Sequence, residues 1–256
     1  MAVVVVAQLA GLIAMVIVLP LLPPGAPQAR DLFWGAAAGV TVGIGIPLLY
    51  RALAVGRMAV VAPTTAVCAV LIPVTTAMVL GERPRSTTLA GIGLALVSIV
   101  LAGRHDHRAD PPVSVTTGPG AGSGFWLALA AGVGIGLFYL TLARAAPTAG
   151  LWPVLVARSS SVLLLGGAAI VRRQSLRMAL PVAAMVVAAG VIDMISNALY
   201  LIATHHGSLS VVVTLSSLYP ASTVVLALVV LGERLGVLQV VGIVCALVAV
   251  LLIVAR

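Results

Sequence analysis

Charged residues are scarce in this chain of 256 residues. They make up 8% of it, whereas hydrophobic residues make up 62%. A typical soluble domain is about 25% charged and about 45–50% apolar. So few polar residues cannot cover a soluble globule of this size, and the mean hydropathy of +1.24 agrees with this. The deficit of charge excludes an ordinary soluble domain and predicts an integral membrane protein.

Lysine is absent, and all fourteen basic residues are arginines. The arginines stand mostly at the edges of apolar runs, where basic residues anchor helices and signal topology. They do not form the basic face that binds a phosphate backbone. Despite a formal net charge of +8, the sequence therefore argues against a nucleic-acid partner. The arginines do not decide which side of the membrane is cytoplasmic, and nothing indicates an oligomeric state.

Cysteine is also rare. Cys68 and Cys245 both lie in apolar runs, without the spacing of a metal or redox pair, and are expected to be packing residues. The His105-Asp106-His107 triplet has no further ligand cluster near it. No phosphate-binding loop is present. The sequence therefore predicts no metal, no cofactor and no ATP site.

Long apolar runs fill the rest of the chain. Each is near the length of about 20 residues that an α-helix needs to cross a bilayer, and helices satisfy their own backbone polar groups in lipid. The sequence therefore predicts an all-α polytopic membrane protein with nine transmembrane helices. Their expected ranges are 3–22, 33–53, 58–80, 87–103, 125–143, 151–171, 181–203, 209–231 and 236–255.

A polar stretch, residues 104–123, is rich in Pro, Gly, Ser and Thr. It has too little apolar surface to fold alone. We interpret it as a linker between a first part, 1–103, and a second part, 124–256.

The two parts resemble each other. "LGER" occurs at 80–83 and again at 231–234, and a Gly follows each copy at the same distance. Further back the alignment pairs Tyr50 with Tyr200 and sets Gln8 against Arg158. The chain therefore contains a duplicated unit of several helices, with four in the first part and five in the second. The matched positions of the motif are Gly81 and Gly232, Glu82 and Glu233, and Gly91 and Gly242.

These duplicated motifs resemble those of the EamA-type transporters of the drug/metabolite transporter superfamily. The marks are a Gly-Glu pair after the fourth helix of each repeat and a proline about twelve residues before it, here Pro220. The resemblance implies a ten-helix architecture of two inverted repeats in a bacterial cell membrane. The partner of the helix at 125–143 is missing, so either the chain is N-terminally shortened or its true start lies upstream.

The resemblance also implies secondary transport of small organic molecules, such as amino acids, other metabolites or drugs, by alternating access. A proton or substrate gradient would supply the energy, and no enzymatic activity is implied. Two alternatives stay open. One is a membrane-embedded enzyme that acts on lipids, and the other is a truncated subunit that does not transport.

Polar residues inside the predicted spans are the candidate site. Asp193, Asn197, Tyr200 and Thr204 follow one another at helical spacing and share one face. Asp193 is the only carboxylate well inside a predicted span, and such groups usually face a cavity or a partner. It would bind a cationic group or carry a coupling proton, or else it is a polar residue satisfied by packing. Arg158 would pair with Asp193, attract an anionic substrate or reach the nearer surface.

Prolines mark a second set of candidates. Pro63, Pro73 and Pro220 interrupt predicted helices and each frees a carbonyl group. Broken helices at matching places in two halves point to a transport site, although kinks for packing are the alternative. The polar residues beside the prolines, together with the paired tyrosine, are Thr64, Thr65, Ser217, Tyr219 and Tyr50.

The remaining signals predict structure rather than chemistry. Gly81 and Gly232 would end helices in the left-handed conformation, and Glu82 and Glu233 would meet the positive start of the next helix. Gly35, Gly39 and Gly43 would let another helix approach closely. Trp152 and the His205-His206 pair lie at segment ends, where we expect interfacial residues, with proton sensing as the alternative for the histidines.

Overall fold

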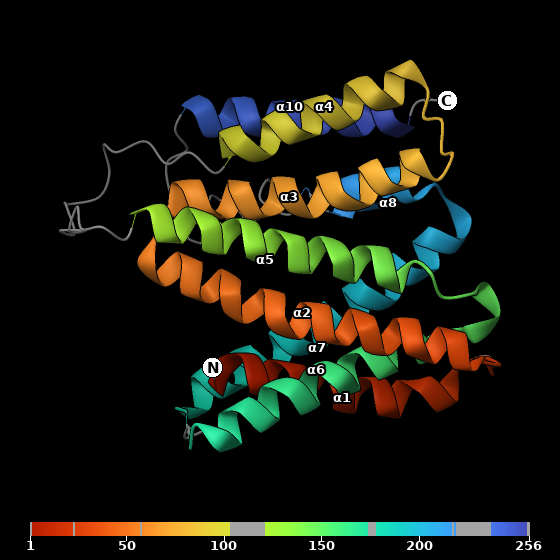
Figure 1. Ribbon diagram of the computed structural model, residues 1–256, viewed down its shortest axis with the longest axis vertical. Helices are drawn as coiled ribbons and strands as arrows, with labels where there is room; N and C mark the ends of the chain where they lie inside the picture. Colours follow the sequence, from red (N-terminus) through yellow and green to blue (C-terminus); the bar gives the residue numbers. More distant parts are fainter. Residues whose placement is uncertain are drawn as a thin grey trace. The chain divides into compact units, whose positions relative to one another are not determined.

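The computed structural model describes residues 2–22, 24–56, 58–102, 121–173, 178–216, 218 and 237–254. Over these ranges every regular element is a helix (Figure 1). The α-helices are α1 (Ala2–Val18), α2 (Ala29–Val55), α3 (Met58–Val79), α4 (Ser86–Ala102), α5 (Ala121–Leu142), α6 (Trp152–Val171), α7 (Leu180–His206), α8 (Leu209–Ser216) and α10 (Val237–Val254). Two 3-10 turns, η1 (Leu19–Leu21) and η2 (Pro147–Ala149), extend α1 and precede α6.

Five of the described helices are long and apolar enough to cross a bilayer. They span Ala2–Leu21, Ala29–Val55, Gly124–Leu142, Trp152–Val171 and Leu180–His206, and three shorter apolar helices span Thr64–Val79, Ser86–Leu101 and Val240–Ile253. The prediction of an all-α polytopic membrane protein is confirmed. Most of the predicted linker 104–123 and most of the predicted span 209–231 lie outside the described residues.

Contacts divide the chain into two compact units. Unit 1 comprises Met1–Pro47 and Leu137–Gly207, and unit 2 comprises Leu48–Gly136 and Ser208–Arg256. Each unit thus combines a segment from before the predicted linker with a segment from after it. These units describe packing in space. The repeats at 1–103 and 124–256 are inferred from the sequence alignment and stay a prediction.

Three glycines of α2 let this helix pack closely against α6 in unit 1. Gly35, Gly39 and Gly43 all face α6, as the four-residue spacing predicts. A side chain would not fit there, because a Cβ atom at Gly35 would lie 2.5 Å from the carbonyl oxygen of Pro153 and one at Gly39 would collide with the carbonyl of Ala157. Since the contacts advance together along both helices, α2 and α6 run in the same direction.

The same contact recurs in unit 1 between α1 and α7. A Cβ atom at Gly190 would collide with the carbonyl of Ala7. Ala7 directly precedes Gln8, and Ala157, the residue of α6 that contacts Gly39, directly precedes Arg158. Gly39 and Gly190 are separated by the same number of residues as the two LGER copies. Such reciprocal contacts are the mark of an approximate two-fold axis. The axis relates the α1–α7 pair to the α2–α6 pair.

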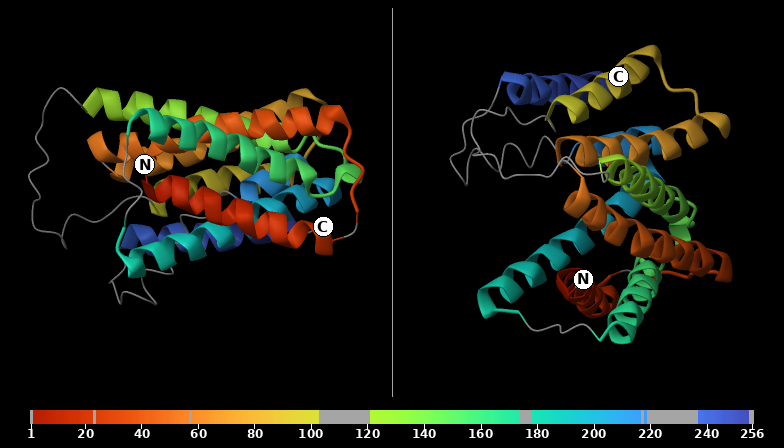
Figure 2. Two further views of the ribbon diagram at one scale, coloured as in Figure 1. Left: turned by 90° about the horizontal axis from the view of Figure 1, so that it is seen from below. Right: turned by 60° about the vertical axis from the view of Figure 1, so that its left-hand side comes forward.

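A second reciprocal pair occurs in unit 2, where α4 and α10 lie side by side (Figures 1 and 2). A Cβ atom at Gly91 would lie 3.1 Å from the carbonyl oxygen of Ala249, and the Ser98 hydroxyl donates to the carbonyl of Gly242 at 2.7 Å. Gly91 and Gly242 are equivalent in the alignment. Ser98 and Ala249 are separated by the same number of residues, so they are equivalent as well. The contacts advance in opposite directions, so the two helices are antiparallel. Antiparallel equivalents are the geometry that an inverted repeat requires.

Helix α3 packs in unit 2 against both α4 and α5. The core with α4 contains Ala66, Val70 and Ile99, and on the other side the Thr65 hydroxyl donates to the carbonyl of Ala128 at 3.2 Å. Pro73 is fully buried, and α3 is continuous from Met58 to Val79. The prediction that Pro63 and Pro73 interrupt this helix is therefore wrong, because a membrane helix tolerates prolines when neighbouring groups satisfy the carbonyls that they free.

The first LGER motif ends α3 and caps α8, both in unit 2. Gly81 adopts a φ of 102°, and the N–H groups of Gly81 and Glu82 donate to the carbonyls of Met78 (3.1 Å) and Ala77 (3.0 Å), which is a Schellman end. The predicted left-handed position of Gly81 is confirmed. Gly232 and Glu233 of the second copy lie outside the described residues.

The Glu82 carboxylate lies at the start of a helix, but that helix is α8 and not α4. It accepts hydrogen bonds from the N–H groups of Leu209 (2.7 Å) and Ser210 (3.2 Å) and from the Ser210 hydroxyl (2.6 Å). The first-turn N–H groups of a helix have no partner inside it, and a carboxylate satisfies them while it meets the positive end of the helix dipole. Glu82 therefore fixes the end of α3 to the start of α8.

Candidate functional site

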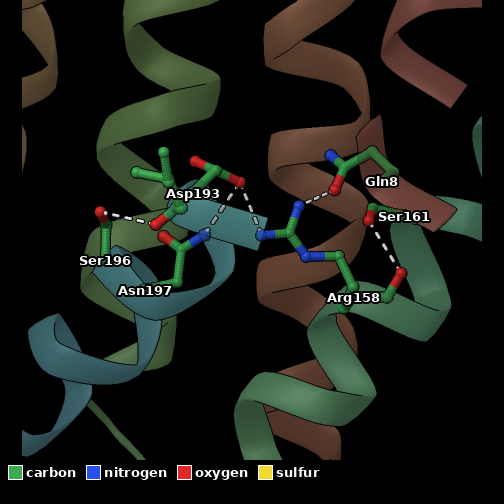
Figure 3. A network of polar contacts seen from close by, with 7 residues as sticks. Gln8, Arg158, Ser161, Asp193, Ser196 and Asn197 are labelled. Carbon is green, nitrogen blue, oxygen red and sulfur yellow. Dashed lines mark hydrogen bonds and ion pairs between the residues drawn. The ribbon is translucent and has the colours of Figure 1, made fainter. Parts of the chain in front are cut away.

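A network of polar side chains joins α1, α6 and α7 inside unit 1 (Figure 3). Arg158 of α6 is at its centre, with a side chain that is only 6% exposed. Gly11 of α1 lets this helix approach α7, because a Cβ atom there would lie 2.9 Å from the carbonyl oxygen of Gly190, whereas the Arg158 Cζ atom would be in ordinary contact with it at 3.5 Å. The absence of a side chain at this position therefore lets α1 lie close to α7, which carries Asp193.

Two partners hold the guanidinium. Nη2 of Arg158 lies 2.6 Å from Oδ2 of Asp193 on α7, and Nη1 donates to Oε1 of the buried Gln8 on α1. Asn197, one turn after Asp193, donates from Nδ2 to the same Oδ2 at 3.3 Å. The short distance and opposite charges make the pair with Asp193 a strong charge-assisted hydrogen bond.

The ion pair is unequally buried. The Asp193 side chain is 57% exposed in the described structure, whereas its partner Arg158 is enclosed. Both hydrogen bonds to Asp193 end on Oδ2, so within the described part of the chain Oδ1 has no partner. Asp193 therefore has one oxygen committed to the protein and one that a ligand or a proton can reach.

Sequence reasoning named Arg158 and Asp193 and left three arrangements of Arg158 open. The structure shows the arrangement in which it pairs with Asp193. Gln8 was not named as a site residue, although the alignment had set it against Arg158. Equivalent residues meet only near the axis that relates two repeats, so their equivalence in the alignment was the available signal.

Two other residues on the predicted polar face of α7 donate hydrogen bonds to backbone carbonyls. Tyr200 is buried and its hydroxyl donates to the carbonyl of Tyr139 at 2.9 Å, with the two ring centroids 4.8 Å apart. The Thr204 hydroxyl donates to the carbonyl of Leu201 at 2.7 Å. Within the described structure, Asn197 is thus the one further residue on this face of α7 that contacts Asp193.

The candidates beside the prolines belong to unit 2 or lie outside the described residues. Thr65 is buried and bonded to α5, Thr64 is half-buried, and Tyr50 is 55% exposed. Among the described residues of unit 2, these three side chains do not converge on one site. Ser217, Tyr219 and Pro220 are outside the described residues, so their part in a site stays a prediction.

No group of three or more His, Cys, Asp or Glu side chains that could hold a metal ion occurs among the described residues. The His105-Asp106-His107 triplet lies outside them. The guanidinium, carboxylate and amide groups of the Arg158 network offer ionic and hydrogen-bonding chemistry. It can bind a charged group and exchange one partner for another.

Comparison with known proteins identifies the family. The model of the EamA-like transporter family matches residues 122–255. Solved structures are also similar, among them one described as a crystal structure of a protein, with a TM-score of 0.71 and 15% identity over 99% of this chain and 86% of that chain. At this identity the likeness shows the fold alone. No curated protein sequence matches the chain.

The matched region covers just over half of the chain and contains α6 and α7 with Arg158 and Asp193. The first part, with α1 and Gln8, lies outside the match. The earlier resemblance rested on motifs in both parts, and the match confirms it. This all-helical membrane protein belongs to the EamA-like transporter family, a family of membrane transporters of small molecules.

Proposed function

We propose that the chain is a secondary transporter of small organic molecules that works by alternating access between two inverted repeats, with the Arg158–Asp193 pair as its substrate or coupling site. The observation that carries the proposal is the enclosed Arg158, which Gln8 and Asp193 hold from two other helices.

The depth of this network supports a role in transport. Gln8, Arg158 and Asp193 each lie inside a segment long enough to cross a bilayer. At 1.5 Å per residue, Arg158 lies about 9 Å along α6 from its first residue. Ionisable residues at such depth are costly and commonly mark substrate or proton pathways. A buried ion pair is weak evidence for a purely stabilising role, since hydrophobic residues often stabilise equally well.

The open oxygen of Asp193 supports a mechanism of partner exchange. A positive group that reaches Oδ1, either the ammonium of a substrate or a proton, reduces the charge that Asp193 offers to Arg158. The guanidinium is then held less tightly to α7, while Gln8 still holds it to α1. A ligand shifts a two-state equilibrium only through different affinities for the two states, and this exchange provides such a difference.

Counterflow in proteoliposomes tests the proposal. Vesicles containing the purified protein would be loaded with unlabelled amino acids, and entry of the labelled amino acids would be measured. We expect exchange by the natural protein, at least a tenfold loss in Arg158→Gln and a measurable loss in Asp193→Asn, since neither variant keeps the ion pair. Ser196→Ala is the matched control, because the Ser196 hydroxyl is on α7 but donates to the carbonyl of Ile192 on its own helix.

An imposed pH gradient separates the two roles of Asp193. If Asp193 carries a coupling proton, Asp193→Asn abolishes accumulation driven by the gradient but keeps part of the counterflow. If Asp193 binds the substrate, both activities fall together. Equal activity of all the variants would contradict a site at this pair. A folded protein that exchanges no solute would favour a lipid-active enzyme or a subunit that does not transport.

A further inference from the structure

A cavity of about 980 Å³ lies at one end of unit 1. It is bounded by the end of α1 with η1, the turn η2, the start of α6 and the end of α7. The residues that define it chemically are Leu19, Trp152, Leu155, Ile202, His205 and His206. Neither Arg158 nor Asp193 lines the cavity, so it is distinct from the polar network.

The walls are apolar, and their few polar side chains favour hydrogen-bond acceptors. The indole of Trp152 can only donate, and each imidazole carries at least one donor N–H, with an acceptor nitrogen besides when it is neutral. No Asp or Glu is among the described residues that line the cavity. Nε2 of His205 lies 3.1 Å from the carbonyl oxygen of Ala145, so the donor is already used there. His206 is exposed and has no partner among the described residues, so its imidazole is available to a ligand.

Backbone contacts fix the rim of the cavity before a ligand enters. The N–H of Ala26 donates to the carbonyl of Thr148 at 2.9 Å, which ties the segment after η1 to η2. Gly25 is needed for this approach, because a Cβ atom there would lie 2.5 Å from the carbonyl oxygen of Ala149. Small-molecule sites are usually preformed in this way and mostly apolar, with a few placed polar groups.

The start of α6 adds to the preference for an anion. Leu151 and Trp152 line the cavity at this end of the helix, where the dipole places a partial positive charge. Leu155 also lines it and stands three residues before Arg158, on the same side of α6. A ligand in the cavity is therefore about one helical turn, near 5 Å, from the level of the guanidinium.

We propose that this cavity binds an amphipathic organic acid, with its apolar body between Leu19, Leu155 and Ile202 and its carboxylate at His206. The volume suits one molecule of drug size, since such pockets span about 300–1,000 Å³. The inference deepens the proposed transport function and rests on it, because it names the substrate class: apolar acids that dock beside the ion pair before transfer.

Tryptophan fluorescence gives a direct test. Trp34→Phe together with Trp126→Phe leaves Trp152 as the only one of the three tryptophans. In detergent, 6-bromo-2-naphthoate would be titrated against this variant, with the bromine as quencher and 6-bromo-2-naphthylmethylammonium as the matched cation. We expect saturable quenching by the acid and binding roughly tenfold weaker for the cation, the size of effect that one hydrogen bond to a charged group provides.

His206→Gln in the same background should reduce the preference for the acid several-fold, and Ser196→Ala should leave it unchanged. An unaltered far-UV circular dichroism spectrum and melting temperature would show that His206→Gln folds. Quenching that does not saturate, equal binding of both probes, or an unchanged preference in His206→Gln would overturn the inference.

Counterflow separates this inference from the function on which it rests. Bromonaphthoate should inhibit exchange by the natural protein at the concentrations at which it quenches Trp152. Exchange without saturable quenching would contradict the acid site and support the transport function. Saturable quenching in a protein that exchanges no solute would support the acid site and contradict the transport function.

Discussion

Arg158 is a cation enclosed by protein, and its environment decides what each neighbour does. Gln8 supplies a neutral acceptor from α1, and Asp193 supplies the compensating charge from α7. Removal of one member of a buried pair costs more than replacement of both, because the remaining charge is left without compensation. Stability and transport should therefore respond differently to single and double substitutions at this pair.

We predict that Asp193→Leu destabilises the protein by about 1–3 kcal/mol, below the range of fully buried pairs because the carboxylate is more than half exposed. The double variant Asp193→Leu/Arg158→Met should recover most of that loss. Thermal unfolding in detergent measures both stability changes, and counterflow should not recover in the double variant. A double variant less stable than either single one would contradict an uncompensated charge as the cause.

The sequence predicted single residues of the site better than their partners. Asp193 and Arg158 stand out because each is a charge within an apolar run. The hydrogen bond from Arg158 to Gln8 depends on how closely α1 approaches α6, which helical spacing alone does not reveal. Tyr200 was placed on the correct helix, but its bond to the carbonyl of Tyr139 is a tertiary contact.

At the scale of elements, the apolar runs predicted the helices closely. The run at 58–80 corresponds to α3, Met58–Val79, and the run at 87–103 to α4, Ser86–Ala102. Length and hydrophobicity suffice for this, because lipid admits few structures besides the helix. The contact of Glu82 was harder to predict, since a carboxylate near the surface can cap any helix start within reach, and α8 is far along the sequence.

We predict that Glu82→Gln loosens the start of α8. The amide keeps one acceptor oxygen but loses the negative charge that the helix end favours, so the expected cost is about 0.5–2 kcal/mol. Hydrogen exchange followed by mass spectrometry should show faster exchange at Leu209 and Ser210. Exchange in α6, which belongs to unit 1, is the internal reference. Unchanged exchange at the start of α8 would show that Glu82 does not hold it.

At the scale of the whole molecule, reciprocal contacts indicate how the duplicated sequence crosses the membrane. In unit 1, α1 runs parallel to α7 and α2 runs parallel to α6, because the glycine contacts advance together. In unit 2, α4 and α10 are antiparallel. The alignment of the two parts predicted which helices are equivalent. How the equivalent helices pack against each other could not be predicted from the sequence, because in lipid hydrophobicity does not favour one apolar neighbour over another.

These directions predict the sidedness of unit 1 in a membrane. Gln28 follows α1 and Gly207 follows α7, so both should lie on one side, whereas Arg173, after α6, should lie on the other. Each would be replaced by Cys, one at a time, in a background with Cys68→Ala and Cys245→Ala, and labelled in intact cells with a membrane-impermeant maleimide. All three positions are exposed. We expect Gln28→Cys and Gly207→Cys to react alike and Arg173→Cys to react oppositely. If all three react from one side, α1 and α6 run in the same direction, and the inverted relation that alternating access needs is lost.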